Sequence, residues 1–199
     1  LIEKILAPSW ELPSPLRVSL EEADREIHKL SQQQLRLLRQ LAGNRRVAIH
    51  GGAGTGKTVL AVEKAKRLAR EGFPTLLTCF NLPLEEHLRR CCRGIDNLEV
   101  FNFHDLCGHY AGLAGIFVAP PQGPEEANRY YNEILPEVFC QALASVKKRY
   151  RALIVDEAQD FHDSYWVPLT DCLEKPVNDI LYIFYDENQQ IYARGANFP

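Results

Sequence analysis

The sequence predicts an α/β fold in which a mostly parallel β-sheet carries helices on both faces. Apolar runs of strand length, "RRVAIH", "PTLLTCF" and "NLEVFNF", alternate with longer segments of helical periodicity. Two further runs, "ALIVD" and "DILYIFYD", continue the pattern towards the end of the chain. A parallel crossover between strands needs a helix-sized connection, which each of these intervals supplies. A glycine-rich turn between the first of these runs and a helical segment completes the prediction.

Composition limits the classes of protein to consider. The chain has 199 residues, 46% of them hydrophobic, and a formal net charge of −3. This length fits one domain with a small insertion, and the near-neutral charge means that any nucleic-acid binding must be local. The longest apolar runs fall far short of the roughly 20 residues of a membrane span. We therefore expect a cytoplasmic protein with no membrane partner, whose six cysteines are mostly small buried residues.

The order of elements suggests a lead-in over residues 1–29 and a main domain over 30–199. The lead-in carries prolines and then "SLEEADREIHKL", where Ser19 precedes acidic residues in the manner of a helix N-cap. "SQQQLRLLRQLAG" has leucines at helical spacing, and Gly43 is placed to end that helix. A Gly-, Ala- and Pro-rich stretch followed by helical periodicity predicts a small helical insertion at about 107–149.

The glycine-rich turn "GGAGTGKT", residues 51–58, matches the phosphate-binding pattern G-x-x-x-x-G-K-[ST]. Glycines let backbone N–H groups close around phosphate oxygens, and the N-terminus of the following helix adds its positive dipole end. We expect Lys57 to bind the β- and γ-phosphates and the Thr58 hydroxyl to hold Mg²⁺. The residues expected to bind the nucleotide at this loop are Gly51, Gly52, Ala53, Gly54, Thr55, Gly56, Lys57, Thr58 and Val59.

A second acidic motif indicates hydrolysis. "LIVDEAQDF" places Asp156 and Glu157 at the carboxyl end of an apolar strand, where open parallel sheets bind ligands. Asp156 is expected to hold Mg²⁺, and Glu157 is expected to polarise the water that attacks the γ-phosphate. The sequence therefore predicts an enzyme with ATP and Mg²⁺ as cofactors.

Together with "YDENQQIY", these two motifs resemble the motif set of UvrD/Rep-type superfamily 1 helicases, in the same order, from about Leu30 to Gly195. Within that family the chain is similar to the branch associated with NERD domains. The resemblance implies a RecA-like P-loop domain, the N-terminal motor half, which hydrolyses ATP to drive 3′ to 5′ translocation or unwinding along single-stranded DNA, with RNA as an alternative. It also implies a second RecA-like domain beyond this chain that supplies an arginine, so the chain alone is expected to hydrolyse ATP poorly.

The resemblance also assigns roles to individual residues. Gln34, with Gln33 as the alternative, would read the adenine edge, and Gln189 would sense the γ-phosphate as part of the catalytic set with Lys57 and Glu157. Strand contacts are expected where aromatic and polar residues end two strands, in "TCFN" and "FNFHD", an arrangement that suits base stacking. Core packing is the alternative for these aromatics. The expected strand contacts are Phe80, Asn81, Phe103 and His104.

Two departures from the family pattern affect these expectations. The interval between "FNFHD" and "LIVDEAQD" is short, so a surface that engages duplex would be reduced. "IYARGA" has Ala193 where the family has an aromatic residue, and Tyr192 is expected to take its place on the strand. A nucleotide-gated switch that controls a partner domain without tracking along DNA remains the main alternative, and a small-molecule kinase is a further one.

Overall fold

The computed structural model describes residues 10–12 and 36–186. The predictions for Gln34, Gln189 and Tyr192 therefore lie outside the described residues. In the part of the chain between 36 and 186, no helix is long and apolar enough to cross a membrane.

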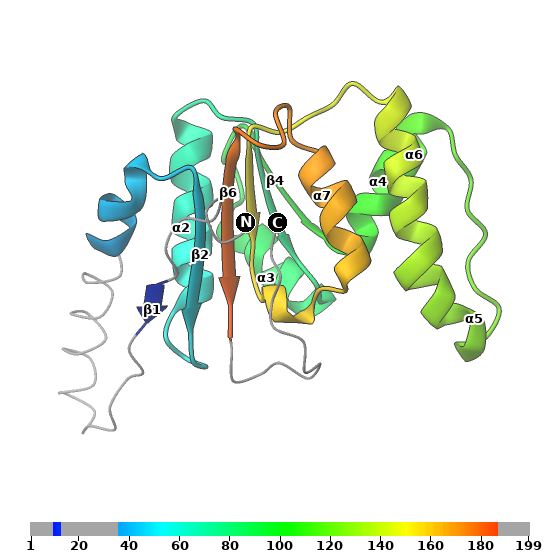
Figure 1. Ribbon diagram of the computed structural model, residues 1–199, viewed down its shortest axis with the longest axis horizontal. Helices are drawn as coiled ribbons and strands as arrows, with labels where there is room; N and C mark the ends of the chain where they lie inside the picture. Colours follow the sequence, from blue (N-terminus) through cyan, green and yellow to red (C-terminus); the bar gives the residue numbers. More distant parts are fainter. Residues whose placement is uncertain (1–9, 13–35, 187–199) are drawn as a thin grey trace.

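Six parallel strands form one sheet in the order β1-β2-β6-β5-β3-β4 (Figure 1). This confirms the predicted parallel α/β fold. Strand β6 lies between β2 and β5. Since all three strands are parallel, the segments that follow β2 and β5 leave the carboxyl edge of the sheet on the two sides of β6. The strands are β1 (Trp10–Leu12), β2 (Arg46–Gly51), β3 (Thr75–Cys79), β4 (Leu98–Asn102), β5 (Ala152–Val155) and β6 (Ile180–Tyr185).

Strand β1 comes from the segment that the sequence assigns to the lead-in. It pairs with the second half of β2, with Trp10 opposite Ile49 and Leu12 opposite Gly51. In the sequence, a proline at position 8 precedes this strand and a proline at position 13 follows it. Proline cannot donate to a strand ladder, so it is confined to edges and ends of sheets. A three-residue strand at the sheet edge fits that limit.

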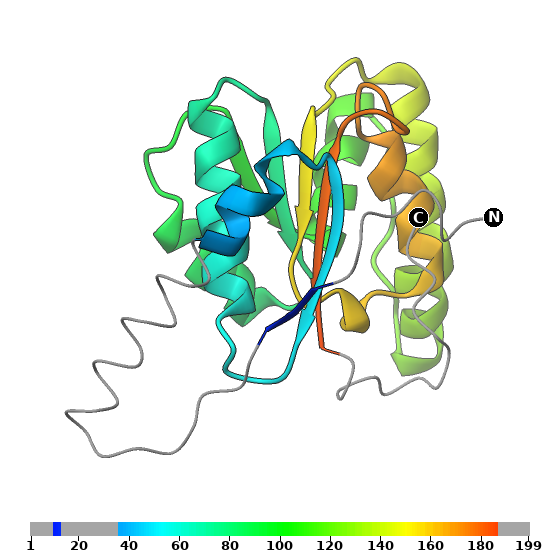
Figure 2. The same ribbon diagram turned by 60° about the vertical axis from the view of Figure 1, so that its left-hand side comes forward.

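Helices cover both faces of the sheet (Figure 2). One face carries α2 (Lys57–Arg70), α3 (Leu82–Cys91) and the turn η2 (Leu41–Gly43), and the other carries α4 (Phe103–Ala114), α6 (Leu135–Ser145) and α7 (Trp166–Asp171). Successive residues of β6 face opposite sides of the sheet. Tyr182 and Phe184 belong to the core with α2, whereas Ile183 and Tyr185 belong to the core with α4. This explains why the strand is apolar throughout, since both faces are buried.

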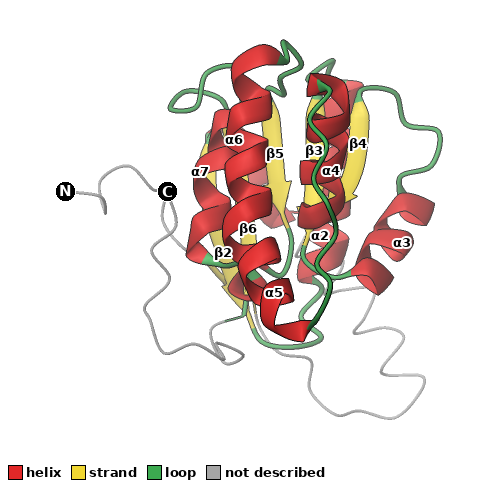
Figure 3. Cartoon of the chain, turned by 90° about the vertical axis from the view of Figure 1, so that its right-hand side faces the viewer, coloured by secondary structure: helices red, strands yellow, loops and turns green. Residues whose placement is uncertain are grey.

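The segment predicted as a helical insertion forms most of the second layer (Figure 3). It includes α5 (Pro124–Arg129), the π-helical turn η3 (Tyr130–Ile134) and α6, which run one after another. Buried side chains of α6, among them Phe139 and Leu143, share a core with α4, α7 and the sheet. Helix α6 therefore packs on α4 and α7, on the side of the sheet away from α2, whereas α5 and η3 bury no residue.

Candidate functional site

The glycine loop joins β2 to α2 at the carboxyl edge of the sheet, the lower edge in Figure 1. Gly54 and Gly56 have φ angles of +75° and +84°, a backbone region that glycine adopts without steric cost. The Thr55 hydroxyl donates to the Gly52 carbonyl at 2.8 Å and closes the turn. Gly56 is the N-cap of α2, so the unpaired N–H groups of the first helical turn lie next to the loop. This backbone has the conformation of an anion-binding loop.

Lys57 places its ammonium group inside this loop. The side chain is only 5% exposed, and Nζ donates to the carbonyls of Gly51 at 2.7 Å and Gly52 at 3.1 Å. The Asp186 carboxylate, at the end of β6, lies 3.7 Å from Nζ. A phosphate is a stronger partner for the ammonium than a neutral carbonyl is, because the phosphate oxygens carry negative charge. Lys57 is therefore held where it can meet an anion that enters the loop.

Asp156 follows β5 and is fully buried. Within the described residues, neither of its carboxylate oxygens has a hydrogen-bond partner. Burial raises the pKa of Asp156 to about 6, although the nearby Thr58 hydroxyl lowers it. A buried carboxylate without partners is costly unless a cation accompanies it. Although the Lys57 ammonium also lowers the pKa of Asp156, a cation bound to the carboxylate oxygens would stabilise the charged form further.

The residues present fit Mg²⁺. Asp156 and Thr58 supply oxygen ligands, the kind that this hard cation prefers. Between residues 36 and 186, no cluster of three or more His, Cys, Asp or Glu side chains could hold a metal by itself. Mg²⁺ is usually held by one or two protein groups together with substrate phosphates and water. The orphaned oxygens of Asp156 are the observation that carries this assignment.

Glu157 adopts an unusual backbone conformation. Its φ is +52°, in the left-handed region, which is uncommon for a residue with a side chain and recurs at functional sites. Gln159 holds the Glu157 carboxylate, since its Nε2 donates to Oε2 at 2.6 Å. The same Gln159 side chain accepts from the backbone N–H of Asp186 at 2.9 Å. One amide thus connects the end of β5 to the end of β6.

The sequence prediction did not include Gln159. Its position two residues after Glu157 in "DEAQD" was the available signal, because an amide can donate and accept at once. Nothing in the local spacing shows that the N–H group from which Gln159 accepts lies at the end of β6. That contact depends on the pairing of β5 with β6.

The expected strand contacts gather at the carboxyl ends of β3 and β4. The Phe80 ring lies 5.6 Å from the ring of His104 and 6.4 Å from that of Tyr165, centroid to centroid. Phe80 and His104 are partly exposed. Burial lowers the pKa of His104 to about 4, so its imidazole is neutral at physiological pH and offers a ring face, not a cation.

A strand contact requires an exposed ring, and Phe103 does not have one. Its side chain is fully buried and stacks on Tyr165 at 4.0 Å. A base cannot reach this ring, so we reassign Phe103 to the core that supports Phe80. Core packing, the alternative stated for the aromatic residues at the strand ends, is therefore the role of Phe103.

Asn81 is exposed and serves as the N-cap of α3, where its Oδ1 accepts from the Leu84 N–H at 2.8 Å. Asn102 does the same for α4, accepting from the Asp105 N–H at 2.9 Å. Capping residues of this type stabilise the first turn of a helix by about 1 kcal/mol. Both strand-end motifs thus use an asparagine to start a helix, and the role of Asn102 was missed from the sequence.

Comparison with known proteins agrees with this geometry. A family model described as an AAA domain matches residues 33–195. That span contains the glycine loop, the strand-end carboxylates and the end of β6. No curated protein matches the chain. Because the family model covers most of the sequence and the loop has the geometry described above, the chain belongs to this AAA domain family of P-loop, ATP-binding domains.

Proposed function

We propose that this chain is the ATP-hydrolysing motor domain of a superfamily 1 helicase-like protein, which couples hydrolysis to movement along single-stranded DNA. The observation that carries the proposal is the pairing of the glycine loop with Asp156 and Glu157 across β6. Asp156 brings a fully buried carboxylate to the loop, and Glu157 brings a second carboxylate held by Gln159. A domain that only binds nucleotide has little need of that second carboxylate.

The residues divide the work of phosphoryl transfer to water. The loop N–H groups and Lys57 bind the phosphates, while Thr58 and Asp156 are placed to hold Mg²⁺. When bound, the metal neutralises charge on the phosphate oxygens. Glu157 orients the attacking water and accepts its proton, and Gln159 keeps that carboxylate in position.

The same hydrogen bonds suggest how hydrolysis could reach a bound strand. Gln159 joins Glu157 to the backbone at Asp186, three residues before Gln189. We propose that Gln189 senses the γ-phosphate and transmits its loss to the strand-binding edge, where Phe80 and His104 lie. A second RecA-like domain, the proposed partner in the full-length protein, would close over the nucleotide and supply an arginine.

The test is steady-state ATPase of the full-length protein with and without single-stranded DNA. A rise of about tenfold or more, about 1.4 kcal/mol in barrier height, is expected with DNA, and Glu157→Gln should abolish it. Single-stranded RNA and blunt duplex DNA are parallel arms that identify the preferred strand. Equal wild-type rates with and without every nucleic acid would refute the motor and favour a nucleotide-gated switch.

A further inference from the structure

We infer that a pocket beside the second half of α2 binds a small phosphate-bearing anion, at the edge of the sheet opposite the glycine loop. The pocket has a volume of about 250 Å³. It is formed by α2, by the connection between η2 and β2, and by residues just before β3 and at the start of β6. The inference goes beyond the proposed function and does not rest on it, because it concerns a second site.

Three basic side chains and one acidic side chain line this pocket, which we call the basic pocket. Lys64 and Arg67 lie one turn apart on α2, and Arg45 comes from the connection before β2. The acidic member, Glu71, is paired with Arg67, whose Nε donates to Oε1 at 2.8 Å. Positive charge is therefore in excess in the basic pocket.

Lys64 has a buried side chain and no anionic partner. The residue is 3% exposed, and its ammonium makes no hydrogen bond or ion pair with the described residues. Its Nζ instead lies 4.1 Å from the centroid of the Tyr182 ring. Burial, followed by the positive charge of Arg67, lowers the pKa of Lys64 to about 8, although the Glu71 carboxylate acts in the opposite direction. Lys64 therefore remains mainly charged at neutral pH, and an anion in the basic pocket would stabilise that charge.

Hydrogen bonds within the protein hold the walls of the basic pocket in place. The Tyr182 hydroxyl lies 2.7 Å from the Leu41 carbonyl oxygen and 2.9 Å from that of Asn44, which fastens β6 to the connection before β2. Arg45 Nη1 donates to a backbone carbonyl before β6 at 3.0 Å. Arg45 and Arg67 thus each use one nitrogen within the protein and keep further N–H groups for a ligand. A pocket formed in advance lowers the entropy cost of binding.

The donors and the size of the basic pocket favour a phosphate group. A guanidinium group can bind two phosphate oxygens at once, and a lysine ammonium adds a compact point charge. A phosphomonoester carries a charge of about −1.5 to −2 at neutral pH, which suits three cations better than a single carboxylate does. A volume of about 250 Å³ is below the range of about 300 to 1,000 Å³ that is usual for drug-sized ligands. The expected ligand is therefore inorganic phosphate or a small phosphomonoester.

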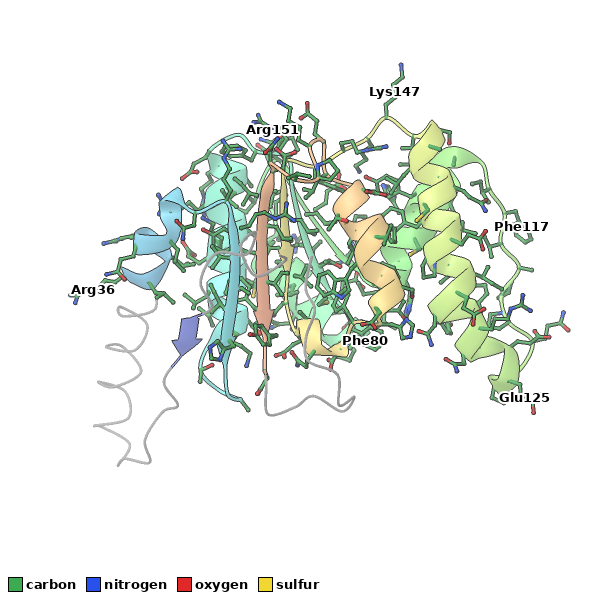
Figure 4. The ribbon with its side chains drawn as sticks, in the orientation of Figure 1. Arg36, Phe80, Phe117, Glu125, Lys147 and Arg151 are labelled. Atoms are coloured by element: carbon green, nitrogen blue, oxygen red, sulfur yellow. The ribbon has the colours of Figure 1, made fainter. Side chains whose placement is uncertain are left out.

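The basic pocket and the glycine loop lie at opposite ends of α2. Lys57 is in the first turn of this helix, whereas Lys64 and Arg67 are in its second half. Figure 4 marks the two edges of the sheet, with Arg151, directly before β5, at the upper edge and Phe80, directly after β3, at the lower edge. The glycine loop is at the lower edge, and the segments before β2 and β3 bring the basic pocket towards the upper one. A bound anion would join α2 to the connection before β2, and these two elements flank the glycine loop.

Isothermal titration calorimetry with inorganic phosphate tests the basic pocket in the full-length protein. The protein carries Lys57→Ala, which weakens phosphate binding at the glycine loop and leaves the basic pocket intact. Phosphate should bind it with a Kd of about 1 mM or lower. Adding Lys64→Gln or Arg67→Gln should raise this Kd about 10- to 100-fold, because each removes a charged donor. Lys66→Gln is the matched control, since it removes the same charge from α2 outside the basic pocket, and it should leave the Kd unchanged.

Two further titrants identify the class of ligand. Glycerol phosphate is a small phosphomonoester, and whichever of the two phosphate compounds binds more tightly shows which form the basic pocket takes. Acetate carries a single charge and should bind at least about tenfold more weakly than phosphate.

Four results would overturn the inference: no binding of either phosphate compound to the Lys57→Ala protein, an unchanged Kd with Lys64→Gln, an equal loss of affinity with Lys66→Gln, or acetate binding as tight as that of phosphate. Arg67 is 44% exposed, so Arg67→Gln takes the place of Lys64→Gln if the latter does not fold. All four results leave the proposed function standing, because ATP hydrolysis with and without single-stranded DNA tests it separately.

Discussion

Replacing Asp156 by asparagine should stabilise the protein in the absence of nucleotide and metal. Both carboxylate oxygens are buried and have no hydrogen-bond partner among the described residues. The pKa of Asp156 rises from 3.8 to about 6 on folding, mainly because burial disfavours the charged form. At about 1.4 kcal/mol for each tenfold change in proton affinity, this amounts to about 3 kcal/mol.

The sign of this effect sets its dependence on pH. A carboxyl group whose pKa is raised by folding binds more protons in the folded state, so the stability it contributes falls as pH rises from 3.8 through about 6. The Asp156→Asn variant lacks that titration. Its advantage over wild type should be about 1 kcal/mol near pH 4.5 and about 3 kcal/mol near pH 8. For a chain of this size the latter corresponds to a rise in Tm of about 6 to 12 °C.

Thermal unfolding in EDTA at the two pH values checks this prediction. Asp96→Asn is the matched control, since Asp96 is exposed, and its Tm should follow wild type. Mg²⁺ with an ATP analogue at a thousand times Kd should reverse the order, because ligand binding then stabilises wild type by about 4.1 kcal/mol, whereas the variant lacks the carboxylate and should gain less than about 1 kcal/mol. Asp156→Asn that is no more stable than wild type at the higher pH would refute the reasoning.

Three further predictions concern neighbouring contacts. Ser164→Ala leaves the Asn132 carbonyl without its donor and should lower the free energy of unfolding in urea by about 1 kcal/mol. Pro136→Ala restores an N–H group for that carbonyl, so in this background Ser164→Ala should cost nothing, and additive effects of the two substitutions would contradict the prediction. Gln159→Leu removes the hydrogen bond to the Glu157 carboxylate and, under the proposed mechanism, should lower kcat about 10- to 100-fold at unchanged KM for ATP. A wild-type kcat would exclude the positioning role. Phe103→Ala should lower the free energy of unfolding by about 3 to 5 kcal/mol, and an unchanged Tm would disprove its core assignment.

The nucleotide loop and the parallel sheet were predictable because their signals are local. The spacing of Gly51, Gly56 and Lys57 is fixed along the chain, and the apolar runs have lengths typical of buried strands. The conformation of Gly54 and Gly56 follows from the same residues. Strand β1 carried no such signal, since three residues are too few to show a period, and its pairing with β2 comes from the fold.

The aromatic residues mark where sequence reasoning ends. Phe80 and Phe103 occupy similar positions after neighbouring strands, yet the first is partly exposed and the second is buried beneath Tyr165. Which of two such rings faces solvent depends on helices that pack from elsewhere in the chain. Gln159 was missed for the same reason, because its partner Asp186 lies 27 residues away and meets it only in the folded domain.

Single-turnover hydrolysis of Mg²⁺-ATP by the full-length wild-type protein and by Glu157→Gln is the most direct test of the catalytic assignment. Nucleotide affinity is measured in parallel, with Lys57→Ala as the variant that should lose binding. Glu157→Gln should keep the wild-type Kd for ATP and hydrolyse it about 100- to 10,000-fold more slowly, as expected when a general base is removed. Hydrolysis by Glu157→Gln at the wild-type rate would show that the carboxylate after β5 does not activate water.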